Sequence, residues 1–239
     1  MRIIFLSDAH GNQYAMRIFF EMLPSFEYDK VIFGGDAVGY YYGGDEVIDM
    51  LRKNSVCCLL GNHDRMLLDV LDGVITEESL ILKYGNSYRD AKSILKSDNI
   101  EFLRGLKSRM EISADGLNMV FVHGSVTDPL NGRVYPDAVF DDVTPYRGID
   151  YVFCGHTHHK MEKHAGSTVI INPGSIGQQR DGKGCTFMLF DTVTRRSEIH
   201  EVRYDIPALV KEIEEREDSE KMRGRLIEVL YRKPDYRKQ

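Results

Sequence analysis

The stretch Arg2-Ile3-Ile4-Phe5-Leu6-Ser7-Asp8-Ala9-His10-Gly11-Asn12 decides the fold of this chain. Its β-branched and aromatic residues through Leu6 predict a buried strand, and the polar residues that follow predict the loop in which the strand ends. That loop carries a carboxylate, Asp8, and an imidazole, His10, two residues apart. Both are metal-ligand types. A single Asp-x-His is a weak signal, so the rest of the chain must decide what the loop does.

The same order of apolar strand, glycine, and then acid or histidine occurs four more times. The further loops are Gly35-Asp36, Gly61-Asn62-His63-Asp64, His123-Gly124 and Gly155-His156-Thr157-His158. Strands that alternate with helical segments over the first third of the chain predict a parallel sheet with right-handed crossovers. The carboxyl ends of parallel strands lie at one edge of a sheet. We therefore expect these side chains to meet in one site.

Composition indicates an ordinary globular protein. The chain has 239 residues, of which 42% are apolar and 28% charged, and its formal net charge is −6. An acidic chain has no electrostatic reason to bind duplex nucleic acid or an anionic membrane, and no window approaches the roughly 20 apolar residues that span a bilayer. The first apolar run is too short for a signal peptide. We expect a cytoplasmic protein with no membrane partner and no nucleic-acid partner.

The whole chain, residues 1–239, is expected to form a single domain, since no repeat or linker divides it. Residues 66–107 lose the strand pattern and predict a helical insertion of two or three helices, beside or over the site. A charged helix over about 206–231 is expected to close the chain. Its apolar residues suit either docking on the domain or a homo-oligomer contact, and the sequence leaves both open.

The polar loops supply the donors of a metal centre. Carboxylate, amide and imidazole ligands without a thiolate suit Mn, Fe, Zn, Co or Ni better than a structural zinc site. Seven such ligands exceed the needs of one tetrahedral ion, but they suit two ions that share a bridging carboxylate. The candidate ligands are Asp8, His10, Asp36, Asn62, His123, His156 and His158.

The five motifs, in this order over residues 8–158, resemble those of the calcineurin-like metallophosphoesterase superfamily. Within it, the chain is most similar to YfcE-type phosphodiesterases and to the branch of diadenosine tetraphosphatases. The Asp-x-His-Gly-Asn opening and the segment Asn172-Pro173-Gly174-Ser175 fit that branch. The resemblance implies an α/β fold of four layers, an α/β/β/α sandwich in which two mixed β-sheets are flanked by helices.

The resemblance also implies a role for each ligand. Asp8, His10 and His158 bind one divalent ion, Asn62, His123 and His156 bind the other, and Asp36 bridges the two. Manganese is the first candidate, with Fe, Zn, Co and Ni as alternatives. A hydroxide held by such a pair of ions can attack phosphorus in line. His63 then assists the leaving group, and Asp64 is a candidate to orient His63.

Two further residues are candidates for substrate binding. Asn12 follows the first ligands and can hydrogen bond a phosphate oxygen, but it is equally placed to act as an ordinary helix N-cap. Arg180 ends the segment Gly177-Gln178-Gln179-Arg180, where the family has Gly-x-Pro-Arg. The tyrosines at 40–42, 84 and 88 suit either stacking on a flat leaving group or packing around the site.

These expectations combine into a bimetal-dependent phosphoesterase that hydrolyses phosphodiester bonds of small or nucleotide substrates. One alternative is a hydrolase of dinucleoside polyphosphates, which an assay of both substrate types would distinguish. Another is a non-catalytic scaffold with the same fold. The relevant scaffold lacks the histidine equivalent to His63 and part of the metal set. Every motif position is filled in this chain, which favours the enzyme.

Overall fold

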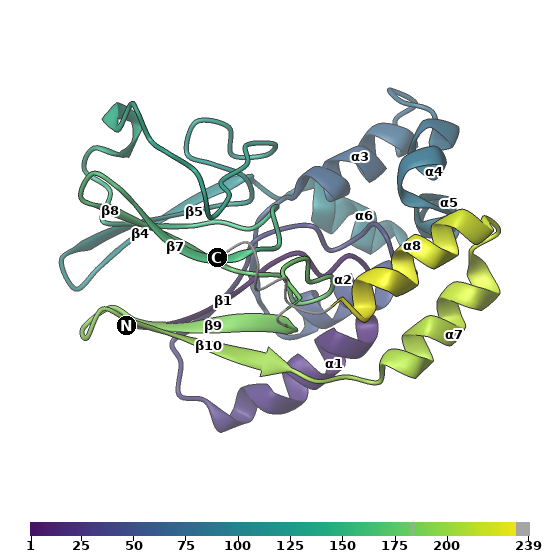
Figure 1. Ribbon diagram of the computed structural model, residues 1–239, viewed down its shortest axis with the longest axis horizontal. Coiled ribbons are helices and arrows are strands. Elements are labelled where there is room, and N and C mark those ends of the chain that lie inside the picture. The colour runs from purple at the N-terminus through teal and green to yellow at the C-terminus, as the bar shows by residue number, and fades with distance from the viewer. Residues whose placement is uncertain (183, 233–239) are drawn as a thin grey trace.

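The computed structural model describes residues 1–182 and 184–232. Two mixed, five-stranded sheets pack face to face, with helices gathered at one side (Figure 1). In the first sheet the strand order is β10-β9-β1-β2-β3, and β1, β2 and β3 run parallel. Its strands are β1 (Arg2–Leu6), β2 (Lys30–Phe33), β3 (Cys57–Cys58), β9 (Cys185–Asp191) and β10 (Arg196–Val202).

The second sheet has the strand order β4-β5-β6-β8-β7. β5, β6 and β8 are parallel, while β4 and β7 pair antiparallel at the two edges. Its strands are β4 (Arg109–Ala114), β5 (Leu117–Val122), β6 (Tyr151–Phe153), β7 (Lys160–Ala165) and β8 (Thr168–Pro173). The parallel strands of both sheets deliver their carboxyl ends, and therefore the polar loops, to the same region.

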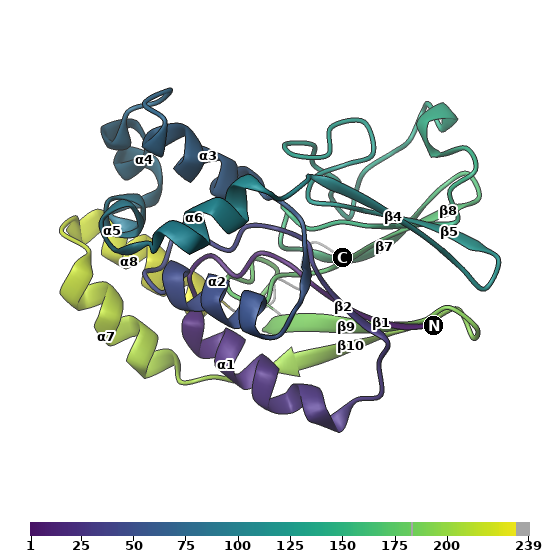
Figure 2. The same cartoon turned by 180° about the vertical axis from the view of Figure 1, so that it is seen from behind.

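The helices cover the first sheet and build the side of the molecule next to the polar loops. α1 (Gln13–Met22) and α2 (Gly44–Lys53) pack on the outer face of the first sheet (Figure 2). The insertion contains α3 (Asn62–Leu71), α4 (Glu77–Tyr84), α5 (Ser87–Ile94) and α6 (Ser97–Arg104), and the helices α7 (Ile206–Arg216) and α8 (Glu220–Leu230) follow β10. Two 3-10 turns, η1 (Leu23–Ser25) and η2 (Thr144–Tyr146), lie in connections.

The alternation of side chains along β1 explains why the two sheets stack. Ile3 and Phe5 face the second sheet, and Phe5 lies 5.7 Å from Phe121 between ring centroids. Ile4 and Leu6 point to the other face and pack under the helices. Side chains alternate between the two faces of a strand, and both faces of β1 are buried. Burial of each such side chain contributes roughly 1.5–3 kcal/mol.

The sandwich of two mixed sheets flanked by helices is confirmed. On the second sheet, the outer layer is the segment between β5 and β6, which contains η2 and packs Val134 and Tyr146 against the strands. None of the described helices is long and apolar enough to cross a bilayer. The cysteines Cys57, Cys58, Cys154 and Cys185 are free.

The helical insertion contains four helices where two or three were expected, and the first begins at Asn62, inside the third motif. Gly85 separates α4 from α5 because it takes φ of +84°, a left-handed conformation that ends a helix. Lys96 is extended and separates α5 from α6. The insertion therefore starts from the site itself and does not merely lie beside it.

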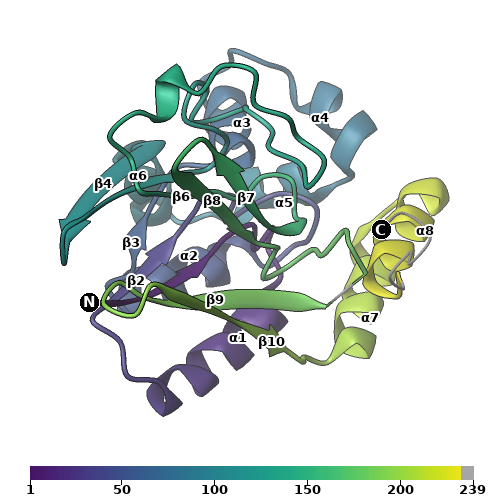
Figure 3. The same cartoon turned by 60° about the vertical axis from the view of Figure 1, so that its left-hand side comes forward.

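The expectation of one closing helix over 206–231 is wrong, because α7 ends at Arg216 and α8 starts at Glu220 (Figure 3). Glu217 is extended and buried, and its carboxylate accepts hydrogen bonds from the Asn86 amide N–H (2.8 Å) and the Tyr42 hydroxyl (3.2 Å). Ser219 then caps α8 by accepting from the amide N–H of Met222. The helix breaks so that Glu217 can reach the insertion.

Candidate metal centre

The loops after β1 and β6 bring Asp8, His10 and His158 together. His10 Nε2 lies 2.9 Å from His158 Nε2, and His158 Nε2 lies 3.3 Å from Asp8 Oδ1. All three side chains are buried. The three residues form a group with the spacing of a metal site, and they are the set expected for the first ion.

A second group forms around His123, which follows β5. Its Nε2 lies 3.0 Å from Asn62 Oδ1 and 3.2 Å from His156 Nδ1. The same nitrogen lies 3.3 Å from Asp36 Oδ2. These are the residues expected for the second ion, and Asp36, His123 and His156 again have the spacing of a metal site.

Asp36 stands between the two groups. Its Oδ2 lies 3.3 Å from His123 Nε2 and 3.7 Å from His10 Nε2. Its Oδ1 accepts a hydrogen bond of 2.7 Å from the amide N–H of His63, whereas Oδ2 is buried and has no hydrogen-bond partner in the described part of the chain. A buried carboxylate oxygen without a donor is costly unless a cation neutralises it. Asp36 therefore presents one unpartnered oxygen to both groups of candidate ligands.

Three backbone carbonyls fix the orientation of the histidine rings. Nδ1 of His10, His123 and His158 lies 3.1, 2.9 and 2.6 Å from the carbonyl oxygens of Val38, Gly34 and Gln178, respectively. A carbonyl oxygen only accepts, so Nδ1 of each ring carries the proton and donates. Each Nε2 is consequently directed at the centre. This arrangement is common for metal-binding histidines, whose other nitrogen is held by the surrounding protein.

The contact between His10 and His158 fits a cation. Burial lowers the pKa of both imidazoles, so both are neutral near pH 7. With Nδ1 protonated in each ring, the two Nε2 atoms present lone pairs to each other across 2.9 Å. Neither atom can donate, and such a contact is repulsive unless a positive charge lies against both lone pairs. A divalent transition-metal ion supplies that charge and prefers imidazole nitrogen.

The second group shows the same preference for positive charge. Burial disfavours the charged form of His123, but the carboxylate of Asp36 outweighs this effect and raises the pKa of His123 to about 9. The carboxylate of Asp36 is itself held ionised, since burial raises its pKa but His123 lowers it further. Without a metal, a proton on His123 provides the positive charge. A metal ion would displace that proton.

The backbone of the site is unusual. Five of the seven candidate ligands have a left-handed φ: Asp8 (63°), His10 (51°), Asp36 (62°), His156 (65°) and His158 (59°). A residue other than glycine in this region costs roughly 1–3 kcal/mol, and such residues gather at functional sites. Hydrogen bonds between loops hold them, as when the amides of Asp8 and His10 each donate across 2.9 Å to the carbonyls of Gly35 and Asp36.

Comparison with known proteins agrees with this geometry. The family model of the calcineurin-like phosphoesterase superfamily domain matches residues 1–195. The chain belongs to this superfamily. It is 30% identical over 233 residues to the uncharacterised protein MJ0912 of Methanocaldococcus jannaschii, covering 88% of this chain and 91% of that one.

Solved structures share the superfamily fold. A metallophosphoesterase from Sphaerobacter thermophilus is 25% identical with a TM-score of 0.74, covering 95% of this chain and 98% of that one. The hypothetical protein PH1004 from Pyrococcus horikoshii is 20% identical with a TM-score of 0.79, covering 96% and 97%. The YfcE phosphoesterase and a putative diadenosine tetraphosphatase, from the branch named on the motifs, have the fold as well. The resemblance inferred from the sequence is confirmed.

In this superfamily member, His63 lies in the first turn of α3, at the edge of the ligand groups. Its Nδ1 lies 2.6 Å from the hydroxyl oxygen of Tyr88. Gly39, with φ of +102°, leaves room for the ring, because a Cβ there would collide with His63 Nδ1. Burial lowers the pKa of His63 to about 4 despite the opposing charge of Asp36. His63 is therefore a neutral imidazole near pH 7.

Asp64 does not take the orienting role that we expected. Its carboxylate accepts hydrogen bonds from the amide N–H groups of Gly61 (2.9 Å), Asp36 (2.8 Å), Ala37 (2.8 Å) and Val38 (3.2 Å). It thus ties the start of α3 to the loop that carries Asp36. The group that contacts the His63 ring is Tyr88, which the sequence indicated only as a stacking or packing residue.

Asn12 is also placed differently from our expectation for substrate binding. Its Oδ1 accepts from the amide N–H of Ala15 (3.1 Å), and its Nδ2 donates to the Gly177 carbonyl (2.8 Å). The side chain is fully buried. The N-cap alternative is the one that the structure supports, because the amide is already engaged at both ends.

Arg180 remains next to the site. Its Nη2 donates to the Tyr40 hydroxyl across 2.8 Å. The ring of Tyr40 lies 4.8 Å from that of His10 and 5.0 Å from that of His63 between centroids. The rings of Tyr41 and Tyr42 are instead buried in a cluster with side chains of α7 and α8, and Tyr41 meets His10 through its backbone amide, which donates to the His10 carbonyl at 3.0 Å.

Proposed function

We propose that this protein is a phosphodiesterase that uses two divalent transition-metal ions, manganese first among them, to hydrolyse phosphodiester bonds of small or nucleotide substrates. The observation that carries the proposal is the contact of two neutral imidazoles, His10 Nε2 and His158 Nε2, across 2.9 Å beside the unpartnered Oδ2 of Asp36. A cytoplasmic location and a single domain over 1–239 belong to the same proposal.

The ligand roles in the proposal follow the two groups. Asp8, His10 and His158 would hold one ion, and Asn62, His123 and His156 the other, with Asp36 between them. When bound, two such ions neutralise charge on phosphoryl oxygens and make water acidic enough to supply a nucleophile near neutral pH.

His63 is proposed to assist the leaving group through Nε2. The Tyr88 hydroxyl keeps its proton, since burial raises its pKa well above the usual value. It donates to His63 Nδ1 at 2.6 Å, because its other contact is the weakly accepting Met66 sulfur at 3.8 Å. The proton of the neutral ring is then on Nε2. That N–H is available to a leaving-group oxygen as negative charge develops on it.

A hydrolase of dinucleoside polyphosphates is the second candidate. It is favoured by Arg180, whose guanidinium lies beside Tyr40 and supplies a positive charge next to the ligand groups. Such a charge suits a substrate with more than one phosphate. Parallel assays of a phosphodiester and of a dinucleoside tetraphosphate distinguish the two candidates.

The test uses wild type and His63→Ala, both stripped of metal and reconstituted with manganese. Hydrolysis of bis-p-nitrophenyl phosphate and of p-nitrophenyl phosphate is measured with the metal content of each sample. We expect metal-dependent diester turnover that falls by about a hundredfold or more in His63→Ala at equal metal content. His164→Ala, at an exposed position of β7, is the matched control and should behave as wild type. Equal turnover by His63→Ala would exclude the role of His63.

A further inference from the structure

A basic pocket of about 240 Å³ lies between the loop 178–180, the C-terminal end of α4 and the helix α8. Its lining includes four cationic side chains, Lys83, Arg180, Arg225 and Arg232, and one carboxylate, Glu228. The elements that supply these charges are far apart in the sequence, so the cluster is a product of the fold and not of one charged run.

The cations of the basic pocket are poorly neutralised by the protein. Lys83 and Arg225 form no ion pair with any residue that the structure describes. Arg232 approaches Glu228 at 3.9 Å, and Arg180 donates to the uncharged Tyr40 hydroxyl. Like charges gathered around one hollow attract an anion to it. Arginine and lysine side chains in such a setting are suited to phosphate oxygens.

The basic pocket shares a wall with the candidate metal centre. Tyr40 lines the pocket, and its ring contacts the rings of His10 and His63 at 4.8 and 5.0 Å. Gln178 also lines it, and its backbone carbonyl accepts from His158 Nδ1 at 2.6 Å. The basic pocket and the candidate metal centre are therefore adjacent, with Tyr40 and Gln178 in contact with both.

The far side of the basic pocket is fixed in position. Gln179 Nε2 donates to the carbonyls of Val229 (3.2 Å) and Arg232 (3.4 Å), at the end of α8. Arg232 Nη1 in turn donates to the Arg180 carbonyl at 3.5 Å. Two of the four cations, Arg180 and Arg232, thus belong to a loop and a helix end that are bonded to each other, which reduces the entropy lost on binding.

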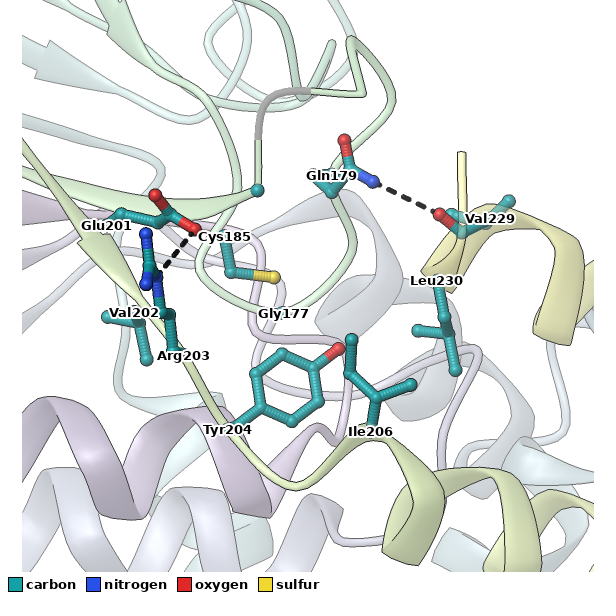
Figure 4. Close-up of a pocket in the computed structure, with 11 residues that line it drawn as sticks. Gly177, Gln179, Cys185, Glu201, Val202, Arg203, Tyr204, Ile206, Val229 and Leu230 are labelled. Carbon is teal, nitrogen blue, oxygen red and sulfur yellow. Dashed lines mark hydrogen bonds and ion pairs between the residues drawn. The ribbon is translucent and has the colours of Figure 1, made fainter. Parts of the chain in front are cut away.

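A neighbouring hollow serves as a comparison. It has a volume of about 130 Å³, and its lining includes Cys185, Tyr204 and Leu230 at the end of α8, as Figure 4 shows. Its one arginine, Arg203, is paired with Glu201 at 3.3 Å. Because this arginine is paired, the hollow has no excess positive charge that would attract an anion.

We propose that the basic pocket binds a phosphate group of the substrate other than the one that is hydrolysed. The inference rests on the proposed function and narrows it to esters that carry a second phosphate. A free phosphate ion has the same chemistry, so the test must separate a phosphate within the substrate from one in solution.

The first arm measures binding without catalysis. Metal-stripped protein is titrated calorimetrically with the p-nitrophenyl ester of thymidine 5′-phosphate and with the same ester bearing an additional 3′-phosphate. We expect wild type to bind the second ester at least about tenfold more tightly, and the charge reversal Lys83→Glu/Arg225→Glu to abolish that difference. Lys221→Glu, an exposed position of α8 outside the pocket, is the control and should retain it. Equal affinity of wild type for the two esters would overturn the proposal.

The second arm measures turnover by manganese-loaded protein. Wild type should prefer the 3′-phosphorylated ester by about tenfold in kcat/KM, and Lys83→Glu/Arg225→Glu should lose the preference. If inorganic phosphate stimulates hydrolysis of the simpler ester while no preference exists, the pocket binds a free ion and the proposal is wrong. If neither ester is hydrolysed, the proposed function fails, and the binding arm still decides whether the pocket takes a phosphate of these esters.

Discussion

The hydroxyl oxygen of Tyr88 lies 2.6 Å from Nδ1 of His63, and both side chains are buried. Tyr88 belongs to α5 and His63 to the first turn of α3, so the helical insertion supports the candidate site directly. A tyrosine that donates to Nδ1 fixes the proton of the neutral ring on Nε2. The insertion therefore does more than cover the edge of the sheet.

Replacing Tyr88 with phenylalanine should lower kcat for bis-p-nitrophenyl phosphate by about five- to tenfold. The change removes one hydrogen bond, of about 1 kcal/mol, that selects the tautomer and orientation of His63. KM and bound metal should stay near wild-type values. Tyr84→Phe is the matched control, because the Tyr84 ring contacts His63 at 4.7 Å without a hydrogen bond to it among the described residues. An equal loss in both variants would show that the hydroxyl of Tyr88 has no special role.

Asp64→Asn should lower the free energy of unfolding by about 2–4 kcal/mol. The carboxylate accepts from four amide N–H groups, and a carboxamide would turn an NH₂ donor toward two of them. Chemical denaturation of the metal-stripped protein measures the effect. Asp69→Asn, at a more exposed position of the same helix, should change stability by much less. If Asp64→Asn kept full stability and lost activity, a direct catalytic role would be required instead.

Metal binding should release about one proton per chain between pH 7 and 8. His123 has its pKa raised to about 9 by Asp36, whereas burial lowers the pKa of His10 and His158. Only His123 among these three ligands is then protonated, and it must lose its proton to bind an ion. The affinity of the protein for the metal ion should rise with pH up to about 9 and level off above that pH. Calorimetric titrations in buffers of different ionisation enthalpy would count the protons, and an absence of release would contradict the assignment of His123.

Glu217→Ala should destabilise the protein by about 1–3 kcal/mol. It removes the acceptor for the buried Asn86 amide and for the Tyr42 hydroxyl, and a buried donor left unsatisfied has a cost of this order. The thermal midpoint should fall while the metal content remains unchanged. Glu214→Ala, an exposed change on α7, should leave the midpoint within about a degree or two. An equal fall of the thermal midpoint in both variants would mean that the measurement reports a loss of helix and not the loss of the Glu217 hydrogen bonds.

The residue pattern was sufficient for the α/β fold and for the expectation that the polar loops meet, and the family resemblance supplied the division of the ligands into two groups. Apolar strands that end in glycine and an acid or histidine can place these groups only at the carboxyl edge of a sheet, and the structure brings Asp8, His10 and His158 together there. It also brings Asn62 and His123 together, with Asp36 between the groups. The position of each loop after a strand predicts that these side chains meet at one edge, and the resemblance predicts which of them belong together.

The contacts between distant loops could not be read from the pattern. No residue pattern near Asp64 indicates that its carboxylate accepts hydrogen bonds from the amides of residues 36–38. Likewise, no pattern near Tyr88 indicates that its hydroxyl contacts His63 from another helix. The left-handed backbone of the ligands is set by hydrogen bonds between loops and not by residue type. The break between α7 and α8 had one local signal, Ser219 as an N-cap. The break also serves Glu217, which accepts from Asn86 and Tyr42, both more than a hundred residues away.

Two-metal catalysis is best tested by a manganese titration of the metal-stripped protein in which bound metal and bis-p-nitrophenyl phosphate hydrolysis are measured on the same samples. Two ions should bind per chain, and turnover should appear as the second site fills. Asp36→Asn should bind fewer than two ions and stay inactive. Wild type that holds two ions but hydrolyses neither the diester, p-nitrophenyl phosphate nor a dinucleoside tetraphosphate would contradict the proposed enzyme and favour a metal-binding scaffold.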